Sequence, residues 1–298
     1  MPISEPWSSR RPQAEQHVDE ERARRLVREQ FPELPADEVR LVSEGWDYVV
    51  HRVDGEWAFR FPRREVVVPG TEREIAVLPL LEVPLAIPRP EYVGVPSDEY
   101  PWPFYGARYI SGEEAAGLDD DARARMARPL ARFLRVLHGH ALDLPVDLQR
   151  RSDMPYRVRR TRQALTAIGD LWPAPTRVED VLREAEALPP AEPTAVVHAD
   201  LHFRQVLVHE GELSGVIDWV DVCRADPGVD LLLYWSFLPP AGRGAFLGEY
   251  GPVADHSLLR GRVLALFLNA ILARYGRDEG VAAVAAEAVA SLERTVLD

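Results

Sequence analysis

The stretch of sequence that decides the fold runs from Val196 to Asp230 and reads VVHADLHFRQVLVHEGELSGVIDWVDVCRADPGVD. It opens inside an apolar strand that ends at His198, and it continues through a polar loop into a second apolar strand at 206–208. The Glu210–Gly211 pair that follows is typical of a tight turn between antiparallel strands. We therefore expect a hairpin whose returning strand, 214–217, folds back beside 206–208.

Three polar side chains lie where such a hairpin would gather them. Asp200 and Gln205 precede the strand at 206–208, and Asp218 follows the returning strand. Mg²⁺ prefers oxygen ligands and takes only one or two from carboxylates, which leaves room for phosphate oxygens and water. Phosphoryl transfer also needs a carboxylate that accepts the proton of the attacking hydroxyl. The sequence therefore predicts that Asp218 and the Gln205 amide oxygen bind Mg²⁺ and that Asp200 is the base.

The same residues carry a family resemblance. H-A-D-L-H-F-R-Q at 198–205 and G-V-I-D-W at 215–219 resemble the H-G-D-x-x-x-x-N and I-D-x motifs of the aminoglycoside phosphotransferase family, relatives of the protein kinases. The resemblance implies transfer of the γ-phosphate of ATP or GTP, with Mg²⁺, to a hydroxyl of a small molecule. It implies that Asp200 is the catalytic base, that Gln205 and Asp218 bind the metal, and that His198 and Asp230 support the catalytic loop.

The N-terminal part is similar to the macrolide phosphotransferase branch of that family, in the run GWDYVVHRVDGEWAFRFPRRE at 45–65. The resemblance implies that 43–48 is a loop over the nucleotide phosphates and that Arg60 pairs with the α- and β-phosphates. It implies that Glu74 holds that arginine and that the backbone of 108–112 hydrogen-bonds the base. The nucleotide-binding residues expected on this basis are Ser43, Gly45, Arg60, Glu74, Arg108 and Ile110.

Three positions depart from the family pattern. Gln205 replaces an asparagine, which keeps the amide oxygen and adds a methylene group. Arg60 replaces a lysine, and its guanidinium can bind phosphate with two nitrogens. Ala199 replaces a glycine, which matters only if the backbone needs a positive φ there.

The rest of the chain predicts two parts, 1–110 and 111–298. The first part begins with a loose tail (1–13) and a helix (14–31), and three short strands follow (38–45, 48–55 and 56–62). A second helix (71–81), which starts with a Thr71–Glu74 capping box, and two further strands complete it. The second part is mostly helical, with helices expected at 119–138, 151–168, 178–188 and 280–297. This order and the resemblance predict an α+β, bilobal, protein-kinase-like fold with a small β-rich N-lobe and a larger helical C-lobe.

Net charge, apolar runs and cysteine content limit the kinds of partner and the cellular compartment that we expect for this chain. The formal net charge of −13 makes a nucleic-acid partner unexpected. The longest apolar run, Val263–Ala273, is too short to span a bilayer and predicts a buried helix, so no membrane partner is expected. The N-terminus has no signal-peptide pattern, and a single cysteine, Cys223, excludes an intrachain disulfide, so we expect a cytoplasmic protein.

The sequence does not identify the small molecule that would accept the phosphate. An aminoglycoside or macrolide antibiotic, or a metabolite such as an amino alcohol or a glycated amine, would each suit the motifs, and a nucleotide-binding pseudokinase is the alternative if Gln205 does not support turnover. Asp221 is interpreted as bracing a loop or assisting the metal, and His202 as an ordinary loop residue or a phosphate contact. His138 and His140 end a helix, where their charge suits the dipole. Oligomeric state leaves no mark in the sequence.

Overall fold

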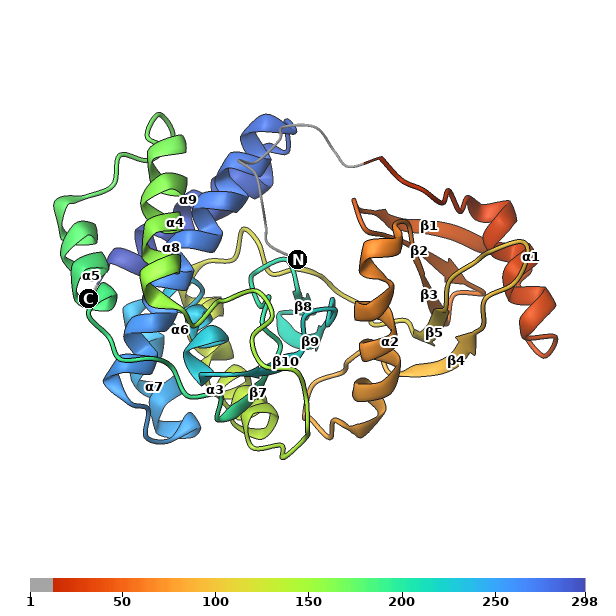
Figure 1. Ribbon diagram of the computed structural model, residues 1–298, viewed down its shortest axis with the longest axis horizontal. Helices are drawn as coiled ribbons and strands as arrows, with labels where there is room; N and C mark the ends of the chain where they lie inside the picture. The colour runs from red at the N-terminus through yellow and green to blue at the C-terminus, as the bar shows by residue number, and fades with distance from the viewer. Residues whose placement is uncertain (1–12, 298) are drawn as a thin grey trace. The chain divides into compact units, whose positions relative to one another are not determined.

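The computed structural model describes residues 13–297, so the predicted tail lies almost wholly outside the described residues (Figure 1). Two compact units make up the chain: 13–80 with 87–110, and 81–86 with 111–297. The segment 81–86 belongs to the second unit because its backbone is bonded there. The Ala86 carbonyl accepts a hydrogen bond from the Val216 amide at 2.9 Å.

The first unit is built on a five-stranded antiparallel sheet in the order β1-β2-β3-β5-β4. The strands are β1 (Val39–Glu44), β2 (Tyr48–Val53), β3 (Trp57–Pro62), β4 (Pro90–Gly94) and β5 (Phe104–Arg108). Asp54 and Gly55 both have positive φ, 49° and 73°, as expected of the tight turn that joins β2 to β3. The three strands predicted from the sequence are confirmed.

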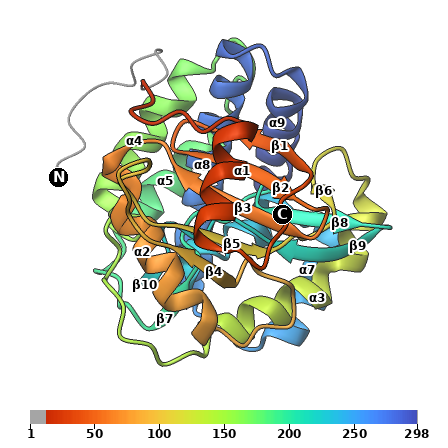
Figure 2. The same cartoon turned by 90° about the vertical axis from the view of Figure 1, so that its right-hand side faces the viewer.

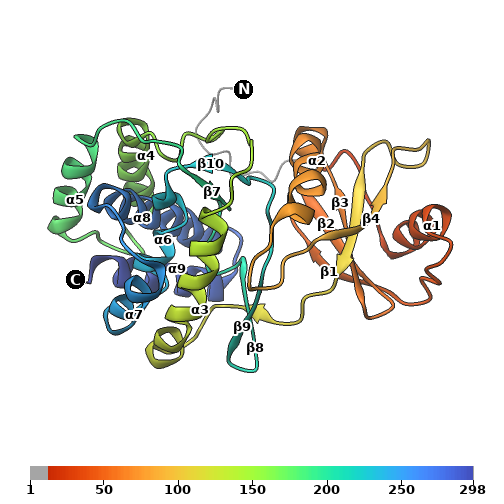
Figure 3. The same cartoon turned by 90° about the horizontal axis from the view of Figure 1, so that it is seen from below.

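Two helices lie on opposite faces of this sheet, α1 (Glu20–Gln30) and α2 (Val68–Val77) (Figures 1 and 3). Figure 2 shows α1 in front of the sheet, where its buried residues meet aromatic side chains of the strands. Phe59 packs against the bare Cα of Gly106 on the neighbouring strand. A Cβ on that glycine would come within 2.5 Å of the Phe59 ring, so only glycine fits there.

The capping box predicted for α2 is wrong. The helix begins at Val68, three residues before Thr71, and its N-cap Val67 makes no side-chain cap hydrogen bond. A 3₁₀ turn, Glu65–Val67, precedes the helix, and Pro69 lies in its first turn, where a missing amide hydrogen costs nothing. Thr71 instead donates its hydroxyl hydrogen to the Val67 carbonyl. Glu74 is thereby left in the helix interior, fully buried.

The second unit is mainly helical, as predicted. Its helices are α3 (Asp120–His138), α4 (Met154–Ala167), α5 (Thr176–Glu186), α6 (Leu232–Ser236), α7 (Pro240–Tyr250), α8 (Asp255–Asp278) and α9 (Ala282–Val296). Apolar side chains of α4, α5, α8 and α9 share one buried core. Asp119 caps the N-terminus of α3, since its carboxylate accepts from the Ala122 amide at 2.7 Å.

Among the described residues, helix α8 is long and apolar enough to cross a membrane, by length and composition alone. Most of its apolar window, 61%, is buried inside the protein, and Val263, Leu266 and Ala270 belong to the shared core. The expectation that Val263–Ala273 forms a buried helix is confirmed.

Short strands complete the second unit. A three-stranded sheet in the order β6-β8-β9 contains Glu113–Glu114, Val206–His209 and Glu212–Val216, and a two-stranded sheet pairs β7 (Ala195–Val197) with β10 (Cys223–Ala225). The predicted hairpin is β8–β9 (Figure 3), and both turn residues, Glu210 and Gly211, have positive φ. Strand β10 was not expected, because three residues in a polar context carry no periodic signal.

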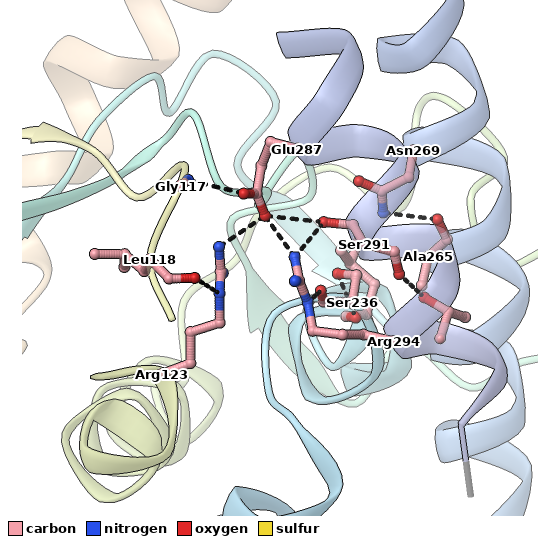
Figure 4. A network of polar contacts seen from close by, with 11 residues as sticks. Gly117, Leu118, Arg123, Ser236, Ala265, Asn269, Glu287, Ser291 and Arg294 are labelled. Carbon is pink, nitrogen blue, oxygen red and sulfur yellow. Dashed lines mark hydrogen bonds and ion pairs between the residues drawn. The ribbon is translucent and has the colours of Figure 1, made fainter. Parts of the chain in front are cut away.

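A buried ionic network joins α3 to α9 (Figure 4). Glu287 of α9 lies 2.7 Å from the Arg123 guanidinium and 2.5 Å from that of Arg294. Its second oxygen accepts the Gly117 amide hydrogen at 2.8 Å. All three charged side chains are nearly inaccessible to solvent, so each needs the others to offset the loss of hydration.

Candidate functional site

The β8–β9 hairpin places two predicted metal ligands side by side. Val206 pairs with Val216, and one step further the Ile217 amide donates to the Gln205 carbonyl at 3.0 Å. Gln205 therefore lies opposite the residue that immediately precedes Asp218. The open end of the hairpin gathers these side chains, as the sequence predicts.

The Gln205 side chain offers an oxygen ready for a cation. It is 8% exposed, and its Oε1 has no hydrogen-bond partner among the described residues. A buried amide oxygen without a partner carries a free-energy cost of about 1–3 kcal/mol, which a bound cation would remove. Together with the Asp218 carboxylate, this is the oxygen donor set that Mg²⁺ takes, so the residues present fit that ion.

His198 links the loop at 198–205 to the end of β9. Its Nδ1 accepts the Asp200 amide hydrogen at 3.3 Å, so Nε2 carries the ring hydrogen and donates to the Ile217 carbonyl at 3.0 Å. Burial lowers the pKa of His198, which keeps the ring neutral. The ring thus fixes the backbone at Asp200 and at the residue before Asp218.

Asp230 accepts three hydrogen bonds from the same region. Its Oδ1 accepts from the Ala199 amide at 3.0 Å, and its Oδ2 accepts from the His198 amide at 2.8 Å and from His138 Nε2 at 3.1 Å. Burial alone would raise the pKa of Asp230, but the bond from His138 and the neighbouring groups hold it below its usual value. Tyr250 in turn lies 2.7 Å from His138 Nδ1.

Two residues of this region have left-handed backbone conformations without being glycine. Ala199 has φ of 73° and Asp218 has φ of 67°. Such conformations cost about 1–3 kcal/mol each and persist only where the surroundings enforce them. The replacement of glycine by Ala199 therefore adds strain, and the bonds to Asp230 hold the loop in place.

Asp200 lies among charged neighbours. Its side chain is 31% exposed, and its Oδ1 is 3.7 Å from Nη2 of Arg151. Burial raises the pKa of Asp200 to about 7; Arg151 opposes this shift, while the charges of Asp221 and Asp218 add to it. A carboxyl group with a pKa near neutrality is suited to exchange a proton with a hydroxyl.

Arg151 was not predicted to belong to the site. It lies in the loop just before α4, and no local sequence pattern distinguishes it from the arginines inside that helix. Its Nη2 lies 2.6 Å from Asp221 Oδ2. This contact agrees with the interpretation of Asp221 as a bracing residue.

His202 is buried beside Asp200. Its Nδ1 accepts the Arg204 amide hydrogen at 3.2 Å, so Nε2 carries the ring hydrogen, 4.0 Å from Asp200 Oδ2. Burial lowers the pKa of His202 to about 3, so the ring is a neutral donor. Both interpretations of His202, loop residue and phosphate contact, remain predictions.

Arg60 and Glu74 meet in the first unit. Arg60 Nε on β3 lies 3.4 Å from Glu74 Oε2 on α2, and its guanidinium stacks 3.7 Å from the Tyr48 ring centroid. The Arg60 side chain is only 13% exposed. The Arg60 guanidinium is thus a largely buried cation that contacts a carboxylate and an aromatic ring.

The other predicted nucleotide residues lie at the edges of the first sheet. Ser43 pairs with Val50 and is exposed, and the Gly45 amide donates to the Tyr48 carbonyl at 2.8 Å. The Arg108 side chain lies 2.9 Å from Glu56. Ile110 is partly buried. Their nucleotide-binding roles remain predictions.

Several other polar or reactive groups are structural. His138 binds Asp230 and His140 binds backbone groups, and among residues 13–297 no group of three or more histidine, cysteine or acidic side chains is arranged to hold a metal ion. Burial raises the pKa of Cys223 to about 12, which keeps the thiol protonated. Phe237 is buried, and the indole nitrogen of Trp235 donates to the Leu258 carbonyl at 2.8 Å, as expected of core residues.

The sequence matches the model of a phosphotransferase enzyme family over residues 38–264. A relative, an uncharacterised protein named YcbJ from Bacillus subtilis (strain 168), is 25% identical over 237 residues, which cover 70% of this chain and 73% of YcbJ.

Solved structures establish the fold. Aminoglycoside 2'-phosphotransferase-IIIa in its GDP complex superposes with a TM-score of 0.66 at 22% identity, over 93% of this chain and 98% of the other. Macrolide 2'-phosphotransferase type I gives 0.60 at 21% identity, over 94% and 99%. Macrolide 2'-phosphotransferase MphH from Brachybacterium faecium gives 0.55 at 21% identity, over 87% and 93%. The predicted α+β, kinase-like fold class is confirmed.

Proposed function

Because this chain belongs to the phosphotransferase enzyme family, whose model spans most of its length, we propose that it moves the γ-phosphate of ATP or GTP onto a hydroxyl group of a small molecule. Three residues near the open end of the β8–β9 hairpin carry the proposal: Gln205, whose side-chain oxygen has no partner among the described residues, Asp218, and Asp200, whose pKa is raised in part by the charge of Asp218. These are the parts that phosphoryl transfer requires: oxygen ligands for a metal and a separate base.

Asp200 is the proposed base. The acceptor oxygen attacks the γ-phosphorus in line, and its hydroxyl proton passes to an Asp200 carboxylate oxygen. The bond between the γ-phosphorus and the bridging oxygen breaks, and its electron pair leaves with the nucleoside diphosphate. His198 and Asp230 position this carboxylate by fixing the backbone on both sides of Ala199.

Gln205 and Asp218 would hold Mg²⁺, which would neutralise charge on the nucleotide phosphates when bound. The longer Gln205 side chain can serve this purpose because its amide oxygen is buried and has no competing donor. This argues against the pseudokinase alternative. Arg60, held by Glu74, is proposed to bind the α- and β-phosphates.

The solved structures with a similar fold suggest which acceptors to test first. One of them was solved as a complex with GDP and kanamycin, and others are named macrolide 2'-phosphotransferases. An aminoglycoside or macrolide is therefore the first acceptor class to test, with amino alcohols and glycated amines as the second.

The test is consumption of Mg·ATP and Mg·GTP over a panel of such hydroxyl acceptors, with the product identified by mass. Asp200→Asn should lower the transfer rate by about 10²–10⁴-fold, the usual contribution of a general base, and leave nucleotide affinity nearly unchanged. Asp143→Asn, at an exposed position, is the matched control and should behave as the native chain. Nucleotide binding without transfer to any acceptor, or equal loss of binding and transfer in Asp200→Asn, would contradict the proposal.

A further inference from the structure

Arg151 presents a cation beside the proposed base with part of its guanidinium unused. The side chain is 14% exposed. One of its three nitrogens, Nη2, contacts both carboxylates, at 2.6 Å from Asp221 and 3.7 Å from Asp200. Among the described residues, Nε and Nη1 of Arg151 make no hydrogen bond. A guanidinium has five N–H donors in a planar fork, so most of its donor capacity is left for another oxygen.

The loop that carries Arg151 is fixed in advance. The Asp147 carboxylate accepts the amide hydrogens of Arg151 at 2.8 Å and Ser152 at 2.6 Å. The Asp147 amide donates to the Arg224 carbonyl at 3.0 Å, which ties the loop to β10. The guanidinium therefore needs little reorganisation to meet a ligand, which is the condition for strong electrostatic stabilisation.

Charge explains why a cation is needed at this place. Asp200, Asp218 and Asp221 bring three negative charges, and one Mg²⁺ would offset two of them. The transferred phosphoryl group adds further negative charge. Arg204, the arginine of the loop that carries Asp200, is paired with Glu114 at 3.2 Å. Arg151 supplies the positive charge that brings the three carboxylates and one Mg²⁺ to neutrality.

We propose that Arg151 is a further catalytic residue, which donates its unused N–H groups to an oxygen of the phosphoryl group in transfer while Asp221 holds the guanidinium. The inference rests on the proposed function. Bond making and breaking are as described for Asp200; Arg151 keeps its proton throughout and acts only by hydrogen bonding and charge. A purely structural ion pair with Asp221 is the competing explanation.

The test uses a mimic that needs no acceptor. Mg·ADP with aluminium fluoride imitates the planar phosphoryl group, and its affinity is compared with that of Mg·ADP alone by calorimetry on the full chain. Aluminium fluoride should raise the affinity for Mg·ADP, and we call this gain the added affinity. In Arg151→Gln the added affinity should be about 10²–10³-fold smaller than in the native chain, the usual effect of removing one preorganised donor, while the affinity for Mg·ADP alone should be nearly unchanged. Arg151→Lys should restore part of it. Arg150→Gln, at an exposed position paired with Asp153, is the matched control.

Asp221→Asn separates the two explanations. It removes the partner but keeps the guanidinium, so its loss of added affinity should be smaller than that of Arg151→Gln. Equal effects in the two variants, without rescue by lysine, would assign Arg151 a structural role and overturn the proposal. Full added affinity in Arg151→Gln would overturn it as well, and would leave the proposed function standing. A native chain that gains no affinity from aluminium fluoride and phosphorylates no acceptor would overturn both.

Discussion

Replacing Asp230 with asparagine tests how the catalytic loop is held. The carboxylate accepts from two backbone amides, those of His198 and Ala199, and from His138. Asparagine keeps one acceptor oxygen and turns the other into an NH₂ group, which would face an existing donor. At least one buried N–H therefore loses its partner in Asp230→Asn, and the remaining bonds lose their charge.

The size of the effect follows from these contacts. A buried donor left without a partner costs about 1–3 kcal/mol, and a hydrogen bond to a charged group contributes about 1.5–3 kcal/mol where a neutral one contributes about 1 kcal/mol. The sum over the lost bond and the two remaining bonds is a loss of about 2–7 kcal/mol in the free energy of unfolding. For a unit of this size, that lowers Tm by roughly 4–28 °C. The transfer rate should fall as well, since Ala199 is strained without its brace.

The dependence of stability on pH gives an independent check. The pKa of Asp230 is lower in the folded protein than its usual value of 3.8. Such a group contributes stability that is present above the unfolded pKa and is lost as pH falls through the folded pKa. Below about pH 4, native stability should therefore fall more steeply than that of Asp230→Asn, and the two curves should converge.

Urea unfolding and calorimetry across pH 3–8 would measure both effects. Asp119→Asn is the matched control, because asparagine and aspartate cap helix N-termini equally well. A Tm of Asp230→Asn within about 1 °C of native, or parallel stability curves in acid, would refute the reasoning that this carboxylate braces the loop.

Two further predictions concern buried polar groups. Glu287→Gln leaves Arg123 and Arg294 without their shared carboxylate, so unfolding free energy should fall by about 3–5 kcal/mol in urea titrations. The exposed substitution Glu184→Gln should change it by at most about 0.5 kcal/mol, and equal effects would contradict the network. Gln205→Leu removes the unpartnered amide oxygen, so calorimetry should show weaker Mg²⁺-dependent nucleotide binding, and unfolding should show unchanged or higher stability without ligand. Lower stability together with unchanged Mg²⁺ dependence would argue against a metal ligand.

Much of the site could be predicted from sequence because its residues are close together along the chain. Asp200 and Gln205 precede strand β8, Asp218 follows strand β9, and the Glu210–Gly211 turn fixes which residues of the two strands face each other. Period-two and helical patterns likewise gave the strands of the first unit and the long helices of the second. A capping pattern misplaced the start of α2, because Thr-x-x-Glu also occurs inside helices, where Glu74 serves a buried ion pair.

Contacts between distant segments could not be predicted this way. The sequence by itself determined the β8–β9 hairpin, the α+β class and the family, since each depends on local turns and on motifs along one segment. Only the tertiary structure decided that Arg151 lies beside Asp200 and that His138 binds Asp230. It also showed that Ala199 must adopt a positive φ. The reason is physical: these groups are paired through packing of helices and loops, and the charge or strain of one residue has no periodic trace in the sequence around it.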